Sequence, residues 1–498
     1  MATNHKKLNA LFLPYFSTSH LTPLIDTARL FAARGVTVTI ITTPANALTF
    51  QNRVNSVHAT ASGHQITFHT VKFPSAEVGL PEGIENFGSV TSLAMIPKLY
   101  HGIFLLQKQM EQSVREIRPD CIVSDMFYPW TADLAEELNI PRIMMYFKYH
   151  SVFHSLMIHK PHEKVGSDSD SESFVVPGLP DEIEMTRSQL EDYLKTETQF
   201  GKLMDRVKES ESRSFGVVFT SYSEIEPDYV QYYKNVVERK KALGIKAWSI
   251  GPAFLLNQEG AERGSCTGTI DRDGYVNWLD SKVQNSVLYV CFGSLTRFNK
   301  PQLAEIAGAL EGTRCSFIWV VPKVLKTKEE DEEEEEEEWW LPEGFVERTK
   351  DLGKGMVVKG WAPQALILKH PAIGGFLTHC GWNSILEGVT NGVPMVTWPT
   401  IADQFYNEKL VTQVWKFGVP VGNEYWKVWA TEETPVIGRE KISRAVDMVM
   451  NGGDEAEEMR SIAKWLGEAA KKAVVKDGGS SYNDLKTLIQ DIKLYRPK

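Results

Sequence analysis

The segment 374–396 arranges small, apolar and polar residues in an order that suits anion binding; it reads GGFLTHCGWNSILEGVTNGVPMV. Its apolar residues predict a strand, a helix over Trp382 to Val389 and a second strand, which is the repeating unit of a parallel α/β sheet. Ligands of such sheets bind beyond the carboxyl ends of the strands. Asn383 and Ser384 stand at the expected helix start, where free backbone N–H groups and the helix dipole attract an anion such as a diphosphate.

Further polar side chains surround this unit at useful spacing. His379 lies on the loop that enters the helix and can donate a hydrogen bond to the anion. Glu387 lies one turn further along the helix, so its carboxylate can reach a ribose diol. Asp403 and Gln404 follow the next expected strand, and their side chains can accept from and donate to sugar hydroxyls.

Each residue also has a purely structural alternative. Asn383 or Ser384 can be an N-cap, and Ser384 with Glu387 can form a capping box. Trp361, shortly before Pro363, can be a packed aromatic residue rather than a platform for a nucleotide base. The ordered set, from the indole to the closing acid–amide pair, favours a site for a nucleotide, its diphosphate and a sugar.

A separate pair of residues could supply a general base. His20 ends the sequence STSH just after the strand-like run Ala10 to Phe16, and Asp125 ends the strand-like run CIVSD. A histidine titrates near neutrality, and a neighbouring carboxylate can fix its tautomer. The alternative is that each residue only caps a helix. Because the chain has twelve histidines, the residues alone leave this choice open.

The composition is that of a globular protein of about two domains, with 498 residues and 42% hydrophobic content. The net charge of −10 comes from ten consecutive acids, Glu329 to Glu338, without which 54 acids would balance 54 bases. The charge therefore indicates neither a nucleic acid nor a membrane as partner. We expect the acidic run to form a self-repelling surface loop, with an interaction tail as the alternative.

The cysteines and the apolar runs indicate where the protein works. Five cysteines are scattered without a C-x-x-C spacing, which favours a reducing compartment over disulfide or zinc chemistry. No apolar run has the length of a transmembrane segment, and we interpret the N-terminal MATNHKKLNALFLPYF as a first strand rather than a leader. We expect a cytoplasmic protein. The spaced acids Asp168, Asp170, Asp271 and Asp273 lie in polar stretches, and we expect no metal site there.

Strand-like and helix-like segments alternate in both halves, which predicts two parallel, doubly wound sheets. We expect an N-terminal domain over residues 1–250, a linker rich in Gly and Pro over 251–285, and a second domain over 286–475. The last segment, 476–498, is expected to be helical. The predicted strands are 10–16, 36–42, 122–124, 143–147 and 216–221, then 287–292, 317–321, 356–358, 375–378 and 395–398.

From Trp361 through HCGWNS to Asp403-Gln404, the chain resembles the signature box of the plant family-1 UDP-sugar-dependent glycosyltransferases. The resemblance implies a GT-B fold, in which two Rossmann-like domains face each other across a cleft. It also implies that the N-terminal domain binds the acceptor, that the C-terminal domain binds the UDP-sugar co-substrate, and that the last helix packs back on the N-terminal domain. Neither a cofactor nor a metal is expected.

The resemblance also implies roles for individual residues. In the family, the base is a His just after the first strand and its acid partner lies on a D-x-F segment, which selects His20 and Asp125 for a direct displacement with inversion. The implied donor contacts are to uracil (Trp361, Ala362), to ribose (Gln364, Glu387), to the phosphates (Ser294, His379, Asn383, Ser384) and to the sugar (Trp382, Asp403, Gln404).

The family box favours glucose as the sugar, because Trp382 and Gln404 match members that use UDP-glucose; galactose and glucuronic acid stay open. The segment FVVPGLPDEIEMTRSQL resembles members that act on triterpenoids, steroids and flavonoids. We favour a triterpenoid saponin precursor, with a flavonoid as the alternative, and expect a monomer. Segments that could line the acceptor pocket are Pro81 to Phe87, Tyr146 to His150 and a predicted helix over Met185 to Leu194.

Three other classes of protein are less well supported. A nicotinamide-dependent oxidoreductase would need a G-x-G-x-x-G after a strand, and a serine hydrolase would need a G-x-S-x-G elbow; neither is present. A protein that binds a UDP-sugar without turnover would be expected to lack the base, whereas His20 and Asp125 are both present.

Overall fold

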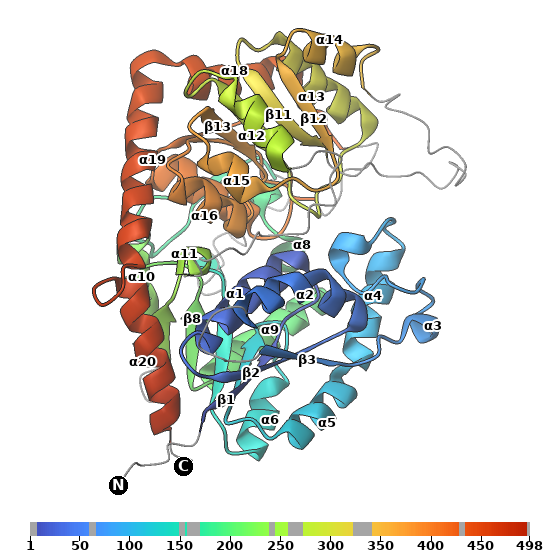
Figure 1. Ribbon diagram of the computed structural model, residues 1–498, viewed down its shortest axis with the longest axis vertical. Helices are drawn as coiled ribbons and strands as arrows, with labels where there is room; N and C mark the ends of the chain where they lie inside the picture. The colour runs from blue at the N-terminus through green and yellow to red at the C-terminus, as the bar shows by residue number, and fades with distance from the viewer. Residues whose placement is uncertain are drawn as a thin grey trace. The chain divides into compact units, whose positions relative to one another are not determined.

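The computed structural model describes residues 7–58, 66–148, 155–156, 170–238, 245–256, 272–321, 341–427 and 434–495. The acidic run 329–338 and the spaced acids Asp168 and Asp271 lie outside these residues, as does most of the middle of the expected linker. The chain divides into two compact units, each with its own sheet (Figure 1). The first unit contains residues 1–149, 197–263 and 470–498, and the second contains 150–196 and 264–469.

The first unit is built on a seven-stranded sheet in the order β3-β2-β1-β4-β5-β8-β9, and every neighbouring pair is parallel. Its strands are β1 (Asn9–Leu13), β2 (Thr37–Thr42), β3 (Ile66–Thr70), β4 (Cys121–Asp125), β5 (Arg142–Tyr146), β8 (Gly216–Phe219) and β9 (Lys246–Ser249). Its helices are α1 (Thr18–Ala32), α2 (Pro44–His58), α3 (Ser75–Val78), α4 (Met95–Leu105), α5 (Gln107–Ile117), α6 (Thr131–Glu137), α9 (Gln199–Ser212), α10 (Pro227–Glu238), α11 (Ala253–Leu256) and α20 (Ser480–Leu494), with a 3-10 turn at Phe87–Ser89.

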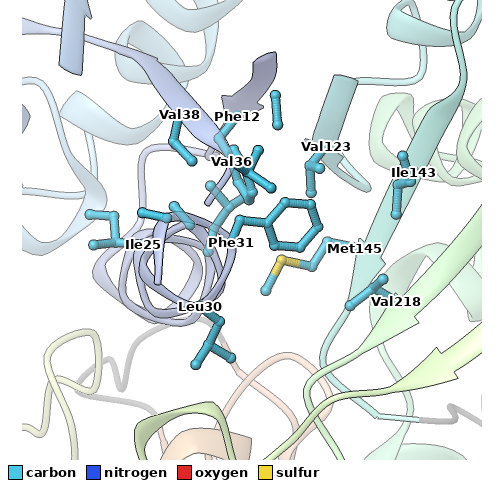
Figure 2. Packing of buried hydrophobic residues seen from close by; sticks show 14 of the residues in the cluster. Phe12, Ile25, Leu30, Phe31, Val36, Val38, Val123, Ile143, Met145 and Val218 are labelled. Carbon is cyan, nitrogen blue, oxygen red and sulfur yellow. The ribbon is translucent and has the colours of Figure 1, made fainter. Parts of the chain in front are cut away.

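The central strands of this sheet are buried along their whole length, as parallel strands are when helices cover both faces. Figure 2 shows one side of this core, where Phe31 of α1 lies against Phe12, Val123 and Met145 of the sheet. The rings of Phe12 and Phe31 meet edge to face at 5.3 Å. Leu485, Leu488, Ile489 and Ile492 of α20 belong to the same buried cluster, so this C-terminal helix is part of the first unit.

The second unit is built on a six-stranded parallel sheet in the order β12-β11-β10-β13-β14-β15. Its strands are β10 (Val287–Cys291), β11 (Ser316–Val321), β12 (Gly355–Lys359), β13 (Ile373–Thr378), β14 (Met395–Thr397) and β15 (Gly418–Pro420). Its helices are α8 (Asp192–Lys195), α12 (Arg272–Asp280), α13 (Lys300–Gly312), α14 (Phe345–Asp351), α15 (Gln364–Lys369), α16 (Trp382–Thr390), α17 (Gln404–Lys409), α18 (Arg439–Asn451) and α19 (Gly453–Ala473), the last of which contains the unit boundary; a π-helical turn covers Leu410–Val414.

The predicted α/β class, with two parallel sheets, is confirmed, and each of the ten predicted strands overlaps a strand of the structure. Three strands of the two parallel sheets were not predicted: β3, β9 and β15. β3 and β9 are edge strands with few fully buried residues, so their sequences carry a weak apolar signal. β15 has only three residues and ends in a proline.

The segment expected to form a helix over Met185 to Leu194 is divided into three short elements, so that prediction is wrong. β7 (Glu184–Thr186) pairs antiparallel with β6 (Ser173–Val175), a 3-10 turn follows at Arg187–Gln189, and α8 begins only at Asp192. The side chain of Gln413 bonds both the backbone N–H and the carbonyl of Glu184, at 3.1 and 3.3 Å. These bonds hold the backbone extended.

Residues 170–196 also differ from expectation in the unit to which they belong. The predicted first domain included them, whereas their contacts lie with the second unit. The carboxylate of Glu191 accepts hydrogen bonds from Tyr406 of α17 at 3.1 Å and from Tyr193 at 2.8 Å. The backbone N–H of Trp426 donates to the carbonyl of Ser188 at 3.0 Å. Such long-range bonds cannot be inferred from chain order.

Candidate active site

In each sheet, the strand order reverses direction at one point, and candidate residues follow the strands on either side of it. In the first sheet this point lies between β1 and β4, which pair through Leu13 and Ser124 at their carboxyl ends. His20 lies in the first turn of α1, which follows β1, and Asp125 is the last residue of β4. Open α/β sheets bind ligands at such a point.

The structure brings His20 and Asp125 into direct contact. Nδ1 of His20 lies 2.7 Å from Oδ2 of Asp125, and the side chains are 16% and 2% exposed. The other carboxylate oxygen, Oδ1, accepts a hydrogen bond from the backbone N–H of Phe127 at 3.0 Å. Because the Nδ1–H donates to the carboxylate, Nε2 keeps the lone pair and is the atom able to accept a proton.

Aromatic rings surround the imidazole. Phe147 meets it edge to face with the ring centroids 4.5 Å apart, and Phe127 and Tyr15 lie at 5.3 and 5.7 Å. Burial raises the pKa of Tyr15 well above its ordinary value, so this hydroxyl stays neutral near pH 7. The rings of Phe147, Phe127 and Tyr15 thus give the imidazole an uncharged aromatic surround on these sides, which suits an apolar acceptor.

In the second sheet, the order reverses between β10 and β13, where Cys291 pairs with Thr378. Ser294 follows β10 and His379 follows β13, so both residues lie at this point. A Cβ atom on Gly293 or on Gly381 would lie 2.5 Å from Nε2 of His379. A larger residue at either position would therefore force the ring to move.

The environment of His379 keeps its imidazole neutral. Burial lowers its pKa to about 4, although the charge of Asp403 acts in the opposite direction. At neutral pH, His379 can therefore donate one N–H to a ligand but adds no positive charge. The helix α16 begins three residues later, with Gly381 as N-cap and Asn383 half-exposed in the first turn.

Three of the predicted donor residues hydrogen-bond one another. The amide nitrogen of Gln364 donates to Oγ of Ser384 at 3.1 Å and to a carboxylate oxygen of Glu387 at 2.8 Å. Ser384 and Glu387 are 8% and 6% exposed. These bonds orient the carboxylate before any ligand arrives, which reduces the entropy that binding would cost.

Within the described residues, the amide of Gln404 is held through its oxygen alone. Oε1 accepts from the backbone N–H groups of Thr400 and Ile401 at 2.9 and 3.0 Å and from the Thr400 hydroxyl at 3.0 Å. The NH2 group is therefore the part of the amide that remains to be offered to a ligand. Asp403 precedes it as the N-cap of α17 and is half-exposed.

Asn407 is a buried residue of this region that the sequence reasoning missed. Its side chain donates to the carbonyl of Cys380 at 2.8 Å and to Asp403 at 3.2 Å. Cys380 has φ of +65°, a conformation that residues other than glycine rarely adopt. Asn407 thus joins the turn before α16 to the acid–amide pair. Its place one helical turn after Asp403 was the only signal in the sequence.

The remaining predicted residues lie at the same ends of the strands. Trp361 follows β12 and is half-exposed, while the carbonyl of the buried Ala362 accepts a hydrogen bond from the backbone N–H of Gln364 at 2.8 Å. Trp382 is 4% exposed, with its ring 6.3 Å from that of Trp415. The carbonyl of Ser294 accepts from the guanidinium of Arg297 at 2.9 Å.

His20 and Asp125 belong to the first unit, and all the predicted donor residues belong to the second. Within the described residues, no group of three or more His, Cys, Asp or Glu side chains could hold a metal ion. Among the described helices, none has the length and apolar character needed to cross a membrane.

Comparison with known proteins gives this arrangement a family. Residues 33–422 match the family model described as UDP-glucoronosyl and UDP-glucosyl transferase. The chain belongs to this family. It is a UDP-dependent glycosyltransferase.

Several relatives match the transferase over nearly its whole length. A UDP-glucosyl transferase of Saponaria officinalis is 46% identical over 98% of this chain and 97% of its own. The soyasapogenol B glucuronide galactosyltransferase of Glycine max is 45% identical over 98% and 96%. A crystal structure of a UGT from Glycyrrhiza uralensis, complexed with glycyrrhetinic acid 3-O-monoglucuronide, has a TM-score of 0.88 at 44% identity, covering 98% of this chain and 96% of that one. The transferase therefore has the GT-B fold of the plant UDP-glycosyltransferases.

Proposed function

We propose that the transferase moves glucose from UDP-glucose to a hydroxyl group of a hydrophobic plant metabolite, and that the acceptor is a triterpenoid or a triterpenoid saponin precursor. The observation that carries the catalytic part is the 2.7 Å contact between His20 and Asp125 among uncharged aromatic rings. A hydroxyl needs a base to become a nucleophile, and an imidazole held by a carboxylate is suited to that task.

In the proposed reaction, Nε2 of His20 takes the proton of the acceptor hydroxyl while the hydroxyl oxygen attacks the anomeric carbon of the sugar. The bond from that carbon to the phosphate oxygen breaks, and its electron pair leaves with UDP. The new glycosidic bond forms on the face opposite the leaving group, so the configuration inverts. Asp125 stabilises the imidazolium that results.

The leaving diphosphate would be held by neutral donors. The backbone N–H groups at the start of α16, the side chains of Asn383 and Ser384, and one N–H of His379 are the proposed contacts. Ser294 would add a hydroxyl from the neighbouring strand end. The uracil would lie on Trp361 against the backbone of Ala362, and the ribose would bond to Gln364 and Glu387.

The proposed preference for glucose rests on the orientation of Gln404. Since its oxygen is already bonded three times, its NH2 group would donate to a sugar hydroxyl, with Asp403 accepting from another and Trp382 lining the sugar. The proposed acceptor class rests on the apolar surroundings of His20. The name of the Glycine max relative contains a glucuronide, soyasapogenol B glucuronide, and the Glycyrrhiza uralensis structure contains another, glycyrrhetinic acid 3-O-monoglucuronide. Both names support the proposed acceptor class for this chain. No cofactor is proposed.

The proposal is tested by mass spectrometry of the purified protein with UDP-glucose, UDP-galactose and UDP-glucuronic acid, each against a panel of triterpenoids, their monoglucuronides and flavonoids. We expect the largest product to be a triterpenoid heavier by one hexose from UDP-glucose. A flavonoid product would replace the acceptor class, and a larger product from another donor would replace the sugar. Absence of both product and UDP release in every mixture would contradict the proposal.

A further inference from the structure

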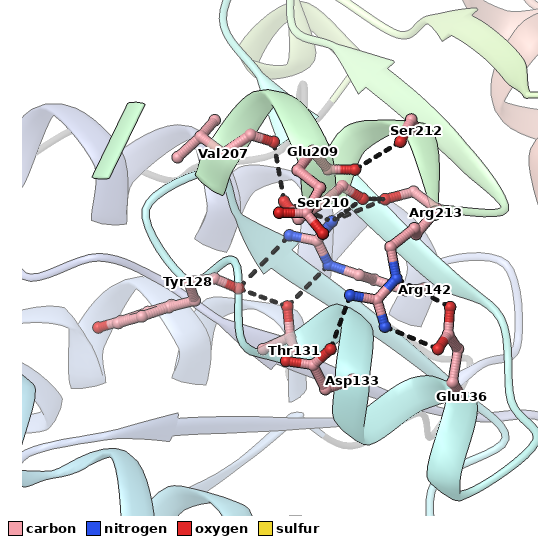
Figure 3. A network of polar contacts seen from close by, with 11 residues as sticks. Tyr128, Thr131, Asp133, Glu136, Arg142, Val207, Glu209, Ser210, Ser212 and Arg213 are labelled. Carbon is pink, nitrogen blue, oxygen red and sulfur yellow. Dashed lines mark hydrogen bonds and ion pairs between the residues drawn. The ribbon is translucent and has the colours of Figure 1, made fainter. Parts of the chain in front are cut away.

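Arg142, the first residue of β5, is a buried cation that the proposed chemistry does not use. It is 2% exposed, and its guanidinium bonds oxygen atoms from β4, the turn that follows it, α6 and α9; Figure 3 shows those of Tyr128, Thr131 and Ser210. Within the described part of the chain, none of its hydrogen-bond acceptors is a carboxylate: they are hydroxyl and carbonyl oxygens. Burial lowers its pKa to about 10, so it is still charged at neutral pH. A buried charge without a direct ion pair is costly.

Three of these bonds converge on the turn 124–131, which contains Asp125. Nε of Arg142 donates to the hydroxyl of Thr131 at 2.7 Å and to that of Ser124 at 3.2 Å, and Nη2 reaches the carbonyl of Tyr128 at 3.4 Å. Ser124 is the neighbour of Asp125, and Thr131 begins α6. The guanidinium therefore joins both ends and the middle of the turn 124–131.

The turn is closed by bonds of its own. The hydroxyl of Thr131 donates to the carbonyl of Tyr128 at 2.6 Å, and the Tyr128 N–H donates to the carbonyl of Asp125 at 3.2 Å. The Asp125 carboxylate accepts a hydrogen bond from the backbone N–H of Phe127. The ring of Phe127 lies 5.3 Å from that of His20. A change at Thr131 or Tyr128 would therefore displace both the carboxylate and the ring that touch the proposed base.

The opposite side of the guanidinium is fixed to α9 and the residues that follow it. Nη1 donates to the carbonyl of Ser210 at 3.1 Å and to the hydroxyl of Ser214 at 2.7 Å. The charge of Asp125 also attracts the guanidinium, as does that of Glu211, which holds the hydroxyls of Tyr146 and Tyr233. The planar fork of arginine can bond all these acceptors together, and a lysine cannot.

We infer that Arg142 is a positioning residue for Asp125: it ties the turn 124–131 to the end of α9 and thereby holds the Asp125 carboxylate against His20. This inference rests on the proposed roles of His20 and Asp125.

The test compares Arg142→Lys in the wild-type protein with Arg142→Lys in an Asp125→Asn background. The substrates are UDP-glucose and the acceptor of the panel that the wild-type enzyme glycosylates fastest. In the wild type, kcat should fall by about 10- to 100-fold, because a displacement of about 1 Å at a reacting group has such an effect. KM for UDP-glucose and the affinity for UDP should stay within about twofold. In the Asp125→Asn background, kcat should not fall by more than about twofold further, because the residue through which Arg142 acts is already disabled.

Arg213 provides the matched control. Its guanidinium bonds Asp133 and Glu136 of α6 at 2.7 and 2.6 Å, so it joins the same two helices at the surface without reaching the turn (Figure 3). Arg213→Met should leave kcat within about twofold of the wild type. An equal loss from Arg142→Lys in both backgrounds, or a parallel loss of UDP affinity, would overturn the inference. A wild-type kcat in Arg142→Lys would do the same.

If Arg142→Lys fails to fold, Thr131→Val decides the question, since it removes one acceptor of the guanidinium at nearly constant volume. A reduced kcat that is absent in the Asp125→Asn background supports the inference, and an unchanged kcat contradicts it. Failure of the proposed function is a separate result. It would appear as wild-type kcat in Asp125→Asn itself.

Discussion

At the scale of single residues, the candidate site consists of groups whose partners determine what they can offer a ligand. His20 offers the lone pair of Nε2 because its Nδ1–H bonds Asp125. Gln404 offers its NH2 group because its oxygen is saturated by Thr400 and Ile401. His379 offers a neutral N–H because burial lowers its pKa to about 4. The chemistry of each residue therefore follows from hydrogen bonds and burial in the protein alone.

Gln404→Glu isolates the proposed amide donor. The carboxylate can accept the three bonds that Oε1 now accepts, but it cannot donate to a sugar hydroxyl. We expect kcat/KM for UDP-glucose to fall by about 10- to 100-fold, since the loss of a hydrogen bond to a substrate hydroxyl leaves a buried group unpaired. Affinity for UDP, which lacks the transferred glucose, should not change.

Gln302→Glu is the control, because Gln302 and Gln404 are both 5% exposed. The amide of Gln302 also bonds the protein backbone: it donates to the carbonyl of Ile437 and accepts from the N–H of the same residue. Gln302 lies on α13 outside the candidate site. Steady-state kinetics and UDP calorimetry on both variants check the prediction. Equal losses of kcat/KM in the two variants would contradict it.

Glu408 of α17 gives a prediction for pH. Burial raises the pKa of this carboxyl to about 7, and it accepts a hydrogen bond from Thr397 at 2.8 Å. Because the folded-state pKa lies above the ordinary value of 4.5, the folded protein binds more protons than the unfolded chain between about pH 4.5 and pH 7. Glu408 therefore contributes stability at low pH that is lost as pH rises through 7.

Glu408→Gln should keep the bond to Thr397 without the titration. We expect the variant to match the wild type near pH 5 and to be more stable at pH 8, by about 1–3 kcal/mol. Thermal unfolding of the two proteins at both pH values measures this. A stability difference of the same size at pH 5 and pH 8 would show that Glu408 does not titrate as inferred.

At the scale of secondary-structure elements, the donor residues are brought together by contacts between α15, α16 and α17. Gln364 bonds across to α16, and Asn407 of α17 bonds back to the turn that precedes α16. These three short helices follow β12, β13 and β14, so the parallel sheet sets their starting points and the side-chain bonds set their fine arrangement.

Asn407→Ala tests the bond between α17 and the turn. It would remove the hydrogen bond that Asn407 donates to the buried carbonyl of Cys380, at a cost of about 1–3 kcal/mol. Since this turn carries the start of α16, we expect UDP affinity to fall by about 10-fold. Isothermal titration with UDP measures the change.

Asn391→Ala is the matched control, because Asn391 also donates to a backbone carbonyl, that of Glu387 at 2.7 Å, but at the other end of α16. It should destabilise the protein without a comparable loss of UDP affinity. If both variants lose the same UDP affinity, the effect of Asn407 is not local to the turn.

The secondary-structure elements also show how much of the candidate site could be predicted from the sequence. The donor residues between Trp361 and Gln404 were recognisable because they lie close together in the chain. His20 and Asp125 each lie at the end of a predicted strand, but the resemblance to the family was needed to select them, because the chain has twelve histidines. Arg142 and Asn407 were not recognisable, since their partners are set by tertiary packing. The helix expected over Met185 to Leu194 fails for the same reason: its backbone is held extended by Gln413, a residue far along the chain.

At the scale of the whole molecule, the two units have separate sheets and separate buried cores. The proposed base belongs to one unit and the proposed donor residues to the other. The expected effect of a variant therefore depends on the unit to which the changed residue belongs. A change at His20, Asp125 or Arg142 should affect turnover, whereas a change at Asn407 should affect UDP binding.

Deletion of Glu329 to Glu338 tests the role of the acidic run. The deletion removes the entire net charge of −10. The nearest described residues on either side of the run are Val321, at the end of β11, and Leu341, and both belong to the second unit. The sequence predicts a solvated run, and solvated charges are screened beyond about 8–10 Å. We expect kcat and KM to stay within about twofold and the isoelectric point to rise. A large loss of activity would assign the run a direct role.

The most direct measurement of the central claim compares transfer by the wild type and by His20→Ala while UDP affinity is measured on the same preparations. We predict that transfer falls by about 10²- to 10⁴-fold and that UDP affinity is unchanged. His370→Ala, which breaks another His–Asp contact, of 3.1 Å with Asp280, should retain transfer. Wild-type transfer by His20→Ala would contradict the account, and so would a loss of UDP affinity that parallels the loss of transfer.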